Sequence, residues 1–179
     1  MSRGDRDRAL ERFDAGEPLP TSALHGRWRG SAVPTGHVLD GLLGTYGWWG
    51  KAFRSDDDVD PLLFEGRDGR VRALEPRLLP LAARTLGVLP RSAAAGRLAA
   101  VAHPLLATRR PRARLRAVEV RGRVSAAMVY DHVPVLDAFR RDPDDTGDLP
   151  RVVLGLMDCR GHAEPFCFRL ERAAGRTAG

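Results

Sequence analysis

The chain has 179 residues, of which 43% are hydrophobic and 29% charged, and its formal net charge is +6. No run approaches the roughly 18 apolar residues that a membrane-spanning helix needs, and the length suffices for one domain with a real core. The N-terminal stretch MSRGDRDRALERFDAGEP is charged and lacks the apolar core of a secretion signal, so we expect a cytoplasmic protein.

The basic residues are nearly all arginine, since lysine occurs once, at Lys51. Such a bias is typical of GC-rich coding sequences, and it makes the positive charge weak support for a nucleic-acid partner. The densest basic run, residues 109–123, alternates basic and apolar residues from Arg114 onward. Alternation of this kind indicates a half-buried strand with one face in water, and we expect no nucleic-acid groove.

The first half of the chain mixes helix and strand signals. Leu10 and Phe13 lie three apart among charged residues and predict a short amphipathic helix near the N-terminus. Residues 24–31 predict a strand that its glycines weaken, because glycine inside a strand often marks a bulge or a sharp bend. Apolar residues at helical spacing in 38–46 predict a short helix that ends at Gly47.

Turn and helix signals follow towards the middle of the chain. Residues 62–64 and 70–74 predict a β-hairpin with Asp68-Gly69 as its turn. Further on, Leu, Ala and Arg dominate between prolines, which predicts two short helices at about 78–87 and 92–102.

The second half consists of alternating or continuously apolar runs with turn signals between them. These runs are ARLRAVEVR, RVSAAMVYDHVPVLDAFRR, RVVLGLMDC and PFCFRLER. The second is too long for one strand, so we expect a break at Asp131 or Pro134. Counted over both halves there are seven or eight strands, which is enough to close a small barrel.

Several of these stretches resemble a known family. Gly26-Arg27-Trp28-Arg29-Gly30, with the following PTGHVLDGLLGTYGWWGKAF, resembles the GXWXG domain, and the strands of the second half resemble its usual companion, domain of unknown function 4334. The resemblance covers residues 20–171, apart from a longer, more acidic loop, DPDDTGDLP. It implies a mainly β fold, an antiparallel calycin-like β-barrel with a few short helices, similar to lipocalins and nitrobindin-like haem proteins.

We therefore predict one structural domain in four segments. These are an N-terminal helix or arm (1–20), the GXWXG half of the barrel (21–75), a helical or loop connection (76–110) and the C-terminal half of the barrel (111–173).

Aromatic residues are the first candidates for a ligand site. Trp28 is expected to plug one end of the barrel and to form the floor of any cavity. Tyr46, Trp48 and Trp49 could form a lid over the barrel mouth or simply pack a helix onto it, and both alternatives stay open. The full set of expected ligand-binding residues is Trp28, His37, Tyr46, Trp48, Trp49, Tyr130, Arg140, Met157, Phe166 and Phe168.

Polar residues near the end of the apolar runs are candidates for acid–base catalysis. Asp158 follows an apolar run, and an inward carboxylate with a raised pKa would be a candidate general base. Tyr130 and His132 share one face of an alternating strand and are the other candidates. Asp137 and Arg140 suit an ion pair, and a structural role for that pair is favoured over catalysis.

The histidines and cysteines do not signal a metal site. No two histidines have the spacing of metal ligands, and Cys159 and Cys167 lack a suitable neighbour. We expect the two cysteines to be free buried thiols. No cofactor is expected, although the nitrobindin-like resemblance leaves haem as a minor alternative, with His162 as its ligand.

Together these features predict a soluble barrel that binds a hydrophobic small molecule, such as a fatty acid or a phospholipid, in its interior. Two alternatives remain: an isomerase, cyclase or hydrolase acting on a hydrophobic substrate in the same cavity, or a haem binder. Peripheral membrane contact and a homodimer are both compatible with the sequence.

Overall fold

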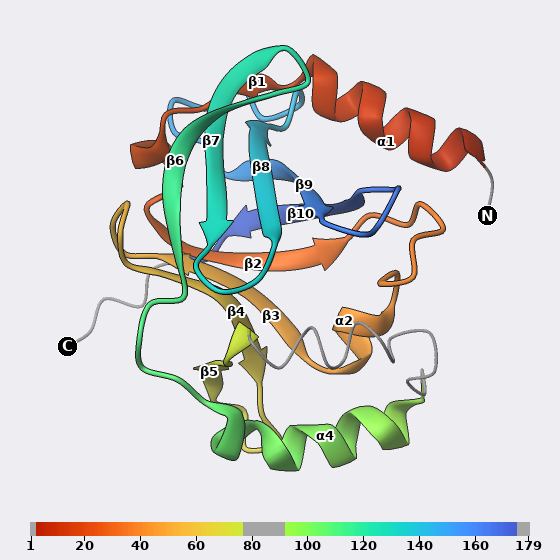
Figure 1. The fold of residues 1–179 in the computed structure, drawn as a ribbon, viewed down its shortest axis with the longest axis vertical. Coiled ribbons are helices and arrows are strands. Elements are labelled where there is room, and N and C mark those ends of the chain that lie inside the picture. Colours follow the sequence, from red (N-terminus) through yellow and green to blue (C-terminus); the bar gives the residue numbers. More distant parts are fainter. Residues whose placement is uncertain (1–2, 77–91, 175–179) are drawn as a thin grey trace.

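Antiparallel strands close into an eight-stranded barrel in the computed structural model, which describes residues 3–76 and 92–174 (Figure 1). The barrel strands are β2 (Gly26–Ala32), β3 (Trp48–Phe53), β4 (Val59–Glu65), β6 (Ala113–Val120), β7 (Arg123–Tyr130), β8 (Val135–Arg141), β9 (Val152–Cys159) and β10 (Phe166–Arg172). Around the barrel their order is β8-β7-β6-β4-β3-β2-β10-β9, and pairing of β9 with β8 closes the ring. The predicted calycin-like architecture is confirmed.

The remaining elements lie around the barrel. They are α1 (Arg3–Ala15), β1 (Glu17–Pro18), the 3-10 turn η1 (Thr21–Leu24), α2 (Leu42–Thr45), β5 (Val71–Ala73) and α4 (Ala93–Leu106). Helix α1 crosses the outside of the barrel, while α4 and the β4–β5 hairpin lie at the opposite end of the molecule (Figure 1).

Most of the elements expected from the sequence are present. The N-terminal helix, the β4–β5 hairpin and all strands of the second half form, and the long second run of that half breaks at 131–134 between β7 and β8. The helix expected at 92–102 is α4, and the one expected at 78–87 lies outside the described residues. The helix expected over 38–46 is only one turn long, because Gly41 and Gly47 at its two ends both have positive φ.

Apolar side chains alternate between the inside of the barrel and its outer face. The apolar side chains inside the barrel, called the inner core below, include Trp28, Trp48, Phe139 and Phe168, whereas a smaller outer group contains Phe13 of α1. Trp28 is fully buried and closes one end, since its indole Nε1 donates to the carbonyl oxygen of Leu24 at 2.6 Å. This agrees with the expected plug.

Residues on the last barrel strand hold the same end of the barrel. The guanidinium of Arg172 lies 4.3 Å from the ring centre of Trp28 and donates to the carbonyl oxygens of Ala23 and His25. A cation over an indole face and two backbone acceptors together fix Arg172. The floor of the barrel is therefore a closed structural unit.

The two glycines of the GXWXG motif have separate uses. Gly26 has φ +125, which side-chain-bearing residues rarely adopt. A Cβ atom at Gly30 would lie 2.4 Å from the Trp48 ring, so the absence of a side chain there makes room for that indole inside the barrel. The motif thus admits two tryptophans to the core, Trp28 on its own strand and Trp48 on the next.

Candidate functional site

A bulge in β3 turns Lys51, the single lysine of the chain, into the barrel. The β3–β4 register slips at Gly50, and a Cβ atom there would lie 1.9 Å from the carbonyl oxygen of Trp28. Gly50 has φ +143, so glycine permits the irregular backbone. After the bulge, Lys51 pairs with the inward-facing Trp28 and is only 2% exposed.

The partner of Lys51 inside the barrel is Asp137 on β8. The Lys51 Nζ atom lies 2.7 Å from Oδ2 of Asp137, whose side chain is completely buried. Lys51 also donates to the carbonyl oxygen of Pro61 at 3.0 Å, and its Nζ lies 3.5 Å from the hydroxyl of Tyr130. Three strands, β3, β7 and β8, thus bring an amine, a phenol and a carboxyl together, and we call Lys51, Tyr130 and Asp137 the inner cluster.

Aromatic rings surround the inner cluster. The Nζ atom of Lys51 lies 5.1 Å from the ring centre of Phe168 and 5.8 Å from those of Trp48 and Tyr130. Faces of aromatic rings attract cations, most strongly where water is excluded. The amine therefore lies in an apolar but cation-stabilising environment.

The carboxyl of Asp137 is incompletely satisfied. Two donors face this carboxyl: the Lys51 Nζ atom, 2.7 Å from Oδ2, and the hydroxyl of Tyr130. A carboxylate offers about four acceptor positions, so two donors leave part of its acceptor capacity unused. Burial raises the pKa of Asp137, and the nearby Lys51 opposes this rise. Burial and the charge of Asp137 raise the pKa of Tyr130 well above its usual value. A buried carboxylate with unused acceptor capacity can bind a further donor.

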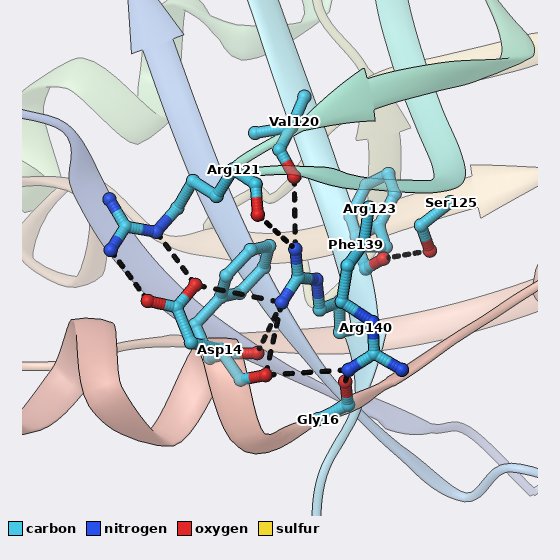
Figure 2. A network of polar contacts seen from close by, with 9 residues as sticks. Asp14, Gly16, Val120, Arg121, Arg123, Ser125, Phe139 and Arg140 are labelled. Carbon is cyan, nitrogen blue, oxygen red and sulfur yellow. Dashed lines mark hydrogen bonds and ion pairs between the residues drawn. The ribbon is translucent and has the colours of Figure 1, made fainter.

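Arg140, three residues beyond Asp137 on β8, lies outside the barrel and is also buried. Its guanidinium donates to the carbonyl oxygens of Asp14 at 3.1 Å and Val120 at 2.9 Å, and it lies 4.7 Å from the ring centre of Phe13 (Figure 2). These contacts tie the end of α1 to the β6–β7 turn. The expected ion pair with Asp137 is wrong, because the two side chains face opposite sides of the sheet, and Arg140 lies 3.5 Å from a carboxylate oxygen of Asp14.

Two of the three expected acid–base candidates lie away from the inner cluster. Asp158 is exposed because Val153 and Met157 take the inward positions of β9, and Asp158 is one residue further on. His132 is exposed in the loop after β7. The inward orientation considered for Asp158 is therefore wrong, and of the three only Tyr130 belongs to the inner cluster.

The expected ligand-binding residues separate into an inner and an outer group. Trp28, Trp48, Tyr130, Phe166 and Phe168 are in the inner core, and Met157 packs against it. Trp49 faces outward beneath Arg27, at 4.7 Å from the ring centre, and Arg140 is also outside. Of the two alternatives for Trp48 and Trp49, a lid does not form, because both residues belong to β3 and point to opposite faces.

The segment 33–47 covers the end of the barrel opposite Trp28. Leu39 and Leu42 join the inner core, and the His37 ring lies 5.5 Å from that of Phe166. Burial lowers the pKa of His37. A hollow of about 240 Å³ lies against His37 and His162, and another of about 590 Å³ lies between α2 and α4 beside Tyr46.

The described residues do not fit a haem or a metal inside the barrel. None of the described strands carries a histidine, and His162 lies half-buried in the turn before β10. In the described ranges, no group of three or more His, Cys, Asp or Glu residues is arranged to hold a metal ion. Both cysteines are free: Cys167 is buried and its pKa is raised by burial to about 11, while Cys159 is half-buried.

Comparisons with known proteins identify the family. Residues 11–69 match the model of the GXWXG protein family, and residues 111–172 match that of the domain of unknown function DUF4334. A crystal structure of a protein from Thermomonospora curvata is 34% identical, with a TM-score of 0.67, over 95% of this chain and 88% of that one. No curated protein matches. The chain belongs to the GXWXG/DUF4334 family of barrel proteins.

Sequence reasoning missed the inner cluster as a unit. In the sequence, Lys51 stands out only as an exception to the arginine bias, and spacing suggests Arg140 as the partner of Asp137, which is wrong. A usable signal was present in WWGKAF, where a glycine precedes the single lysine inside an otherwise apolar strand. Arg172 gave no comparable signal, because its role depends on the pairing of β10 with β2.

Proposed function

We propose that the protein is a soluble, cytoplasmic barrel that binds an apolar small molecule of fatty-acyl type, with the inner cluster as its polar anchor. The observation that supports this most strongly is the incompletely satisfied carboxyl of Asp137 beside Lys51. A buried ion pair is commonly no more stabilising than apolar residues of similar volume. Stability alone therefore gives little reason for placing charges in an aromatic core.

The inner cluster favours a ligand whose polar end is a neutral oxygen group. A hydroxyl can donate to Asp137, and a carbonyl can accept from Lys51 or Tyr130. An ionised carboxylate would be repelled by Asp137 at this range. A fatty acid would accordingly bind in its neutral form, and an alcohol, ester or carbonyl compound would bind better.

The segment 33–47 is the proposed route of access. It covers the aromatic end of the inner core through Leu39, Leu42 and His37, and hollows flank it on both sides. The larger hollow, about 590 Å³, is an open depression outside the barrel, between this segment and α4. Displacement of this one segment would open the barrel without breaking a barrel strand.

A second candidate function is catalysis on the same ligand. Burial raises the pKa of Asp137, so this carboxyl takes up a proton more readily than an exposed one, and the hydroxyl of Tyr130 lies beside it. A buried acid beside an amine is suited to isomerase, cyclase or hydrolase chemistry on an apolar substrate.

Helix α4 supports peripheral membrane contact. Leu98, Val101 and Leu105 are 75%, 56% and 88% exposed on this helix, and Arg97 and Arg109 are exposed close to them in sequence. Apolar residues with neighbouring arginines favour an anionic lipid surface. No helix in the described part of the chain is long and apolar enough to cross a membrane.

The test of the binding function combines native mass spectrometry of freshly purified protein with titration by the apolar dye Nile red. We expect a co-purified apolar molecule or saturable dye binding, with decanol displacing the dye. Asp137→Asn should weaken decanol binding several-fold, whereas Trp49→Ala, on the outer face of the same barrel, should leave it unchanged. Absence of saturable dye binding by the wild-type protein would contradict the proposal, as would equal binding by Asp137→Asn.

A further inference from the structure

The position of the single lysine is unusual in a chain that otherwise uses arginine. Of the 29 lysine and arginine residues, 28 are arginine, and the one lysine is 2% exposed inside the barrel. The two residues differ in one chemical respect that matters here: a guanidinium stays protonated in proteins, whereas a buried ammonium can lose its proton and become a nucleophile. The inner cluster therefore holds the one side-chain amine that the chain has.

The neighbours of Lys51 provide what a nucleophilic amine needs. Oδ2 of Asp137, at 2.7 Å, is close enough to take a proton from Nζ directly. Burial raises the pKa of Asp137, which brings the neutral amine–acid pair closer in free energy to the ion pair. The Tyr130 hydroxyl, 3.5 Å from Nζ, can donate to an oxygen bound beside the amine.

We propose that Lys51 forms an imine with an apolar aldehyde or ketone held in the barrel. This inference rests on the proposed function and specifies the ligand class as carbonyl compounds. A simple carrier of alcohols or esters would need no nucleophile.

The reaction balances within the inner cluster. Asp137 takes one proton from the Lys51 ammonium, the freed lone pair of Nζ forms a bond to the carbonyl carbon, and the π pair of the carbonyl moves to its oxygen. That oxygen takes a proton from Tyr130 or Asp137, giving a carbinolamine. Nζ, which carries a positive charge and two protons after the attack, then gives one proton back to the Asp137 or Tyr130 oxygen that protonated the adduct. A proton from the same pair of groups goes to the hydroxyl, which leaves as water while the freed Nζ lone pair forms the C=N bond. The net change converts ammonium and carbonyl into a protonated imine and one water, with Asp137 and Tyr130 restored.

The surroundings suit the product as well as the reaction. A protonated imine keeps the positive charge that Asp137 balances and that the faces of Trp48 and Phe168 attract. An apolar environment that excludes water also opposes hydrolysis of the imine. The bound state is therefore stabilised by the same contacts that hold the free lysine.

The experiment is reductive trapping with decanal and sodium borohydride, read by intact mass and peptide mapping. We expect one decyl group per chain, attached to Lys51 in preference to the α-amino group of the chain. Decanol, which matches decanal in shape but cannot form an imine, should protect Lys51 in the wild-type protein. Asp137→Asn should slow trapping at Lys51 by about 100-fold or more, as expected for loss of acid–base assistance.

Control variants separate this inference from the proposed function. Lys51→Arg keeps the charge and should abolish trapping at position 51, with circular dichroism and thermal melting as the check on folding. Trapping confined to the α-amino group while decanal still displaces Nile red would overturn the inference and leave the binding function intact. Trapping at Lys51 that decanol does not reduce would also overturn it, because the amine would then react without a binding site. No dye binding at all would overturn the proposed function itself.

Discussion

Strand β8 carries two buried charged residues three positions apart, one on each face, and their surroundings differ. Arg140, on the outer face, donates to backbone carbonyl oxygens of α1 and of the β6–β7 turn and lies on the Phe13 ring (Figure 2). Asp137, on the inner face, has two close donors, Lys51 and the Tyr130 hydroxyl, for the roughly four acceptor positions of a carboxylate. Both charges are desolvated, but Asp137 has more acceptor positions than donors beside it, whereas the contacts of Arg140 are all to fixed parts of the fold.

That difference separates a structural charge from a functional one. A buried cation whose donors are used by fixed carbonyls holds two segments together and has nothing left for a ligand. A buried carboxyl with unused acceptor capacity lowers the stability of the fold, and a ligand that donates a hydrogen bond to it removes part of that loss. The same inner–outer contrast recurs on β3, where Trp48 faces the core and Trp49 the solvent.

The largest expected effect tests the contrast on β3. Trp48→Ala removes a buried ring that packs against Phe168 and should lower the free energy of unfolding by about 3–5 kcal/mol. Trp49→Ala removes an outer ring that contacts Arg27 and should cost only about 0.5–1 kcal/mol. Urea unfolding of both variants measures the two values. Similar losses would mean that the two faces of β3 do not differ as described.

The next effect concerns the outer charge. Arg140→Ala leaves several buried carbonyl oxygens without their donor and should lower the free energy of unfolding by about 3–4 kcal/mol. Arg29→Ala, an exposed arginine on the outer face of β2, is the matched control and should change it by about 0.5 kcal/mol or less. Decanol binding by the folded Arg140→Ala protein should be unchanged. A loss of binding would place Arg140 in the ligand site after all.

Replacing both inner charges together should cost less stability than replacing Asp137 alone. Asp137→Leu alone leaves Lys51 as an uncompensated buried cation and should cost about 3 kcal/mol. Combining it with Lys51→Met replaces the pair by apolar side chains and should restore stability to within about 1 kcal/mol of wild type, while abolishing decanal trapping. A double variant as unstable as the single one would show that the inner pair is structural.

The smallest expected effect is a contrast in pH dependence between two carboxyls. The hydrogen bond from Arg121 lowers the pKa of Asp14 below its usual 3.8. Ionised Asp14 therefore adds to the free energy of unfolding above that pH, and this stabilisation is lost as the pH falls. Burial raises the pKa of Asp137. The stabilisation by this residue is therefore complete at low pH, where the carboxyl is protonated in both the folded and unfolded states, and it is lost as the pH rises through the raised pKa. Unfolding free energies of Asp14→Asn and Asp137→Asn, each subtracted from wild type, should change with pH in opposite directions. Parallel curves would contradict the assignment of the two surroundings.

Alternation along the chain predicted most of the barrel but not the inner cluster. The strands of the second half follow a period of two, which fixes which side chains face inward once one is known. The same rule puts Asp158 outside as soon as Met157 is inside, and it separates Asp137 from Arg140, because residues three apart on a strand face opposite sides. A period of two, followed through β8 and β9, therefore excludes both the inward Asp158 and the Asp137–Arg140 pair.

The position of Lys51 could not be obtained from alternation. The bulge at Gly50 inserts a residue into β3 and shifts the inward phase, so the pattern WWGKAF gives the wrong face for Lys51 unless the bulge is known. The meeting of Lys51 with Asp137 also depends on closure of a barrel in which their strands, β3 and β8, are not neighbours. Local sequence carries no information about such a contact.

The central claim is that Lys51 lies at a ligand-binding site inside the barrel, and the NMR signal of its side chain tests this most directly. Because Lys51 is the single lysine, protein labelled with 15Nζ-lysine gives one side-chain resonance, free of overlap. We predict a slowly exchanging signal that shifts on addition of decanol and changes in Asp137→Asn, as expected for an amine in a ligand-binding barrel. A resonance that exchanges as fast as an exposed lysine, or that no apolar alcohol or aldehyde moves, would contradict the account.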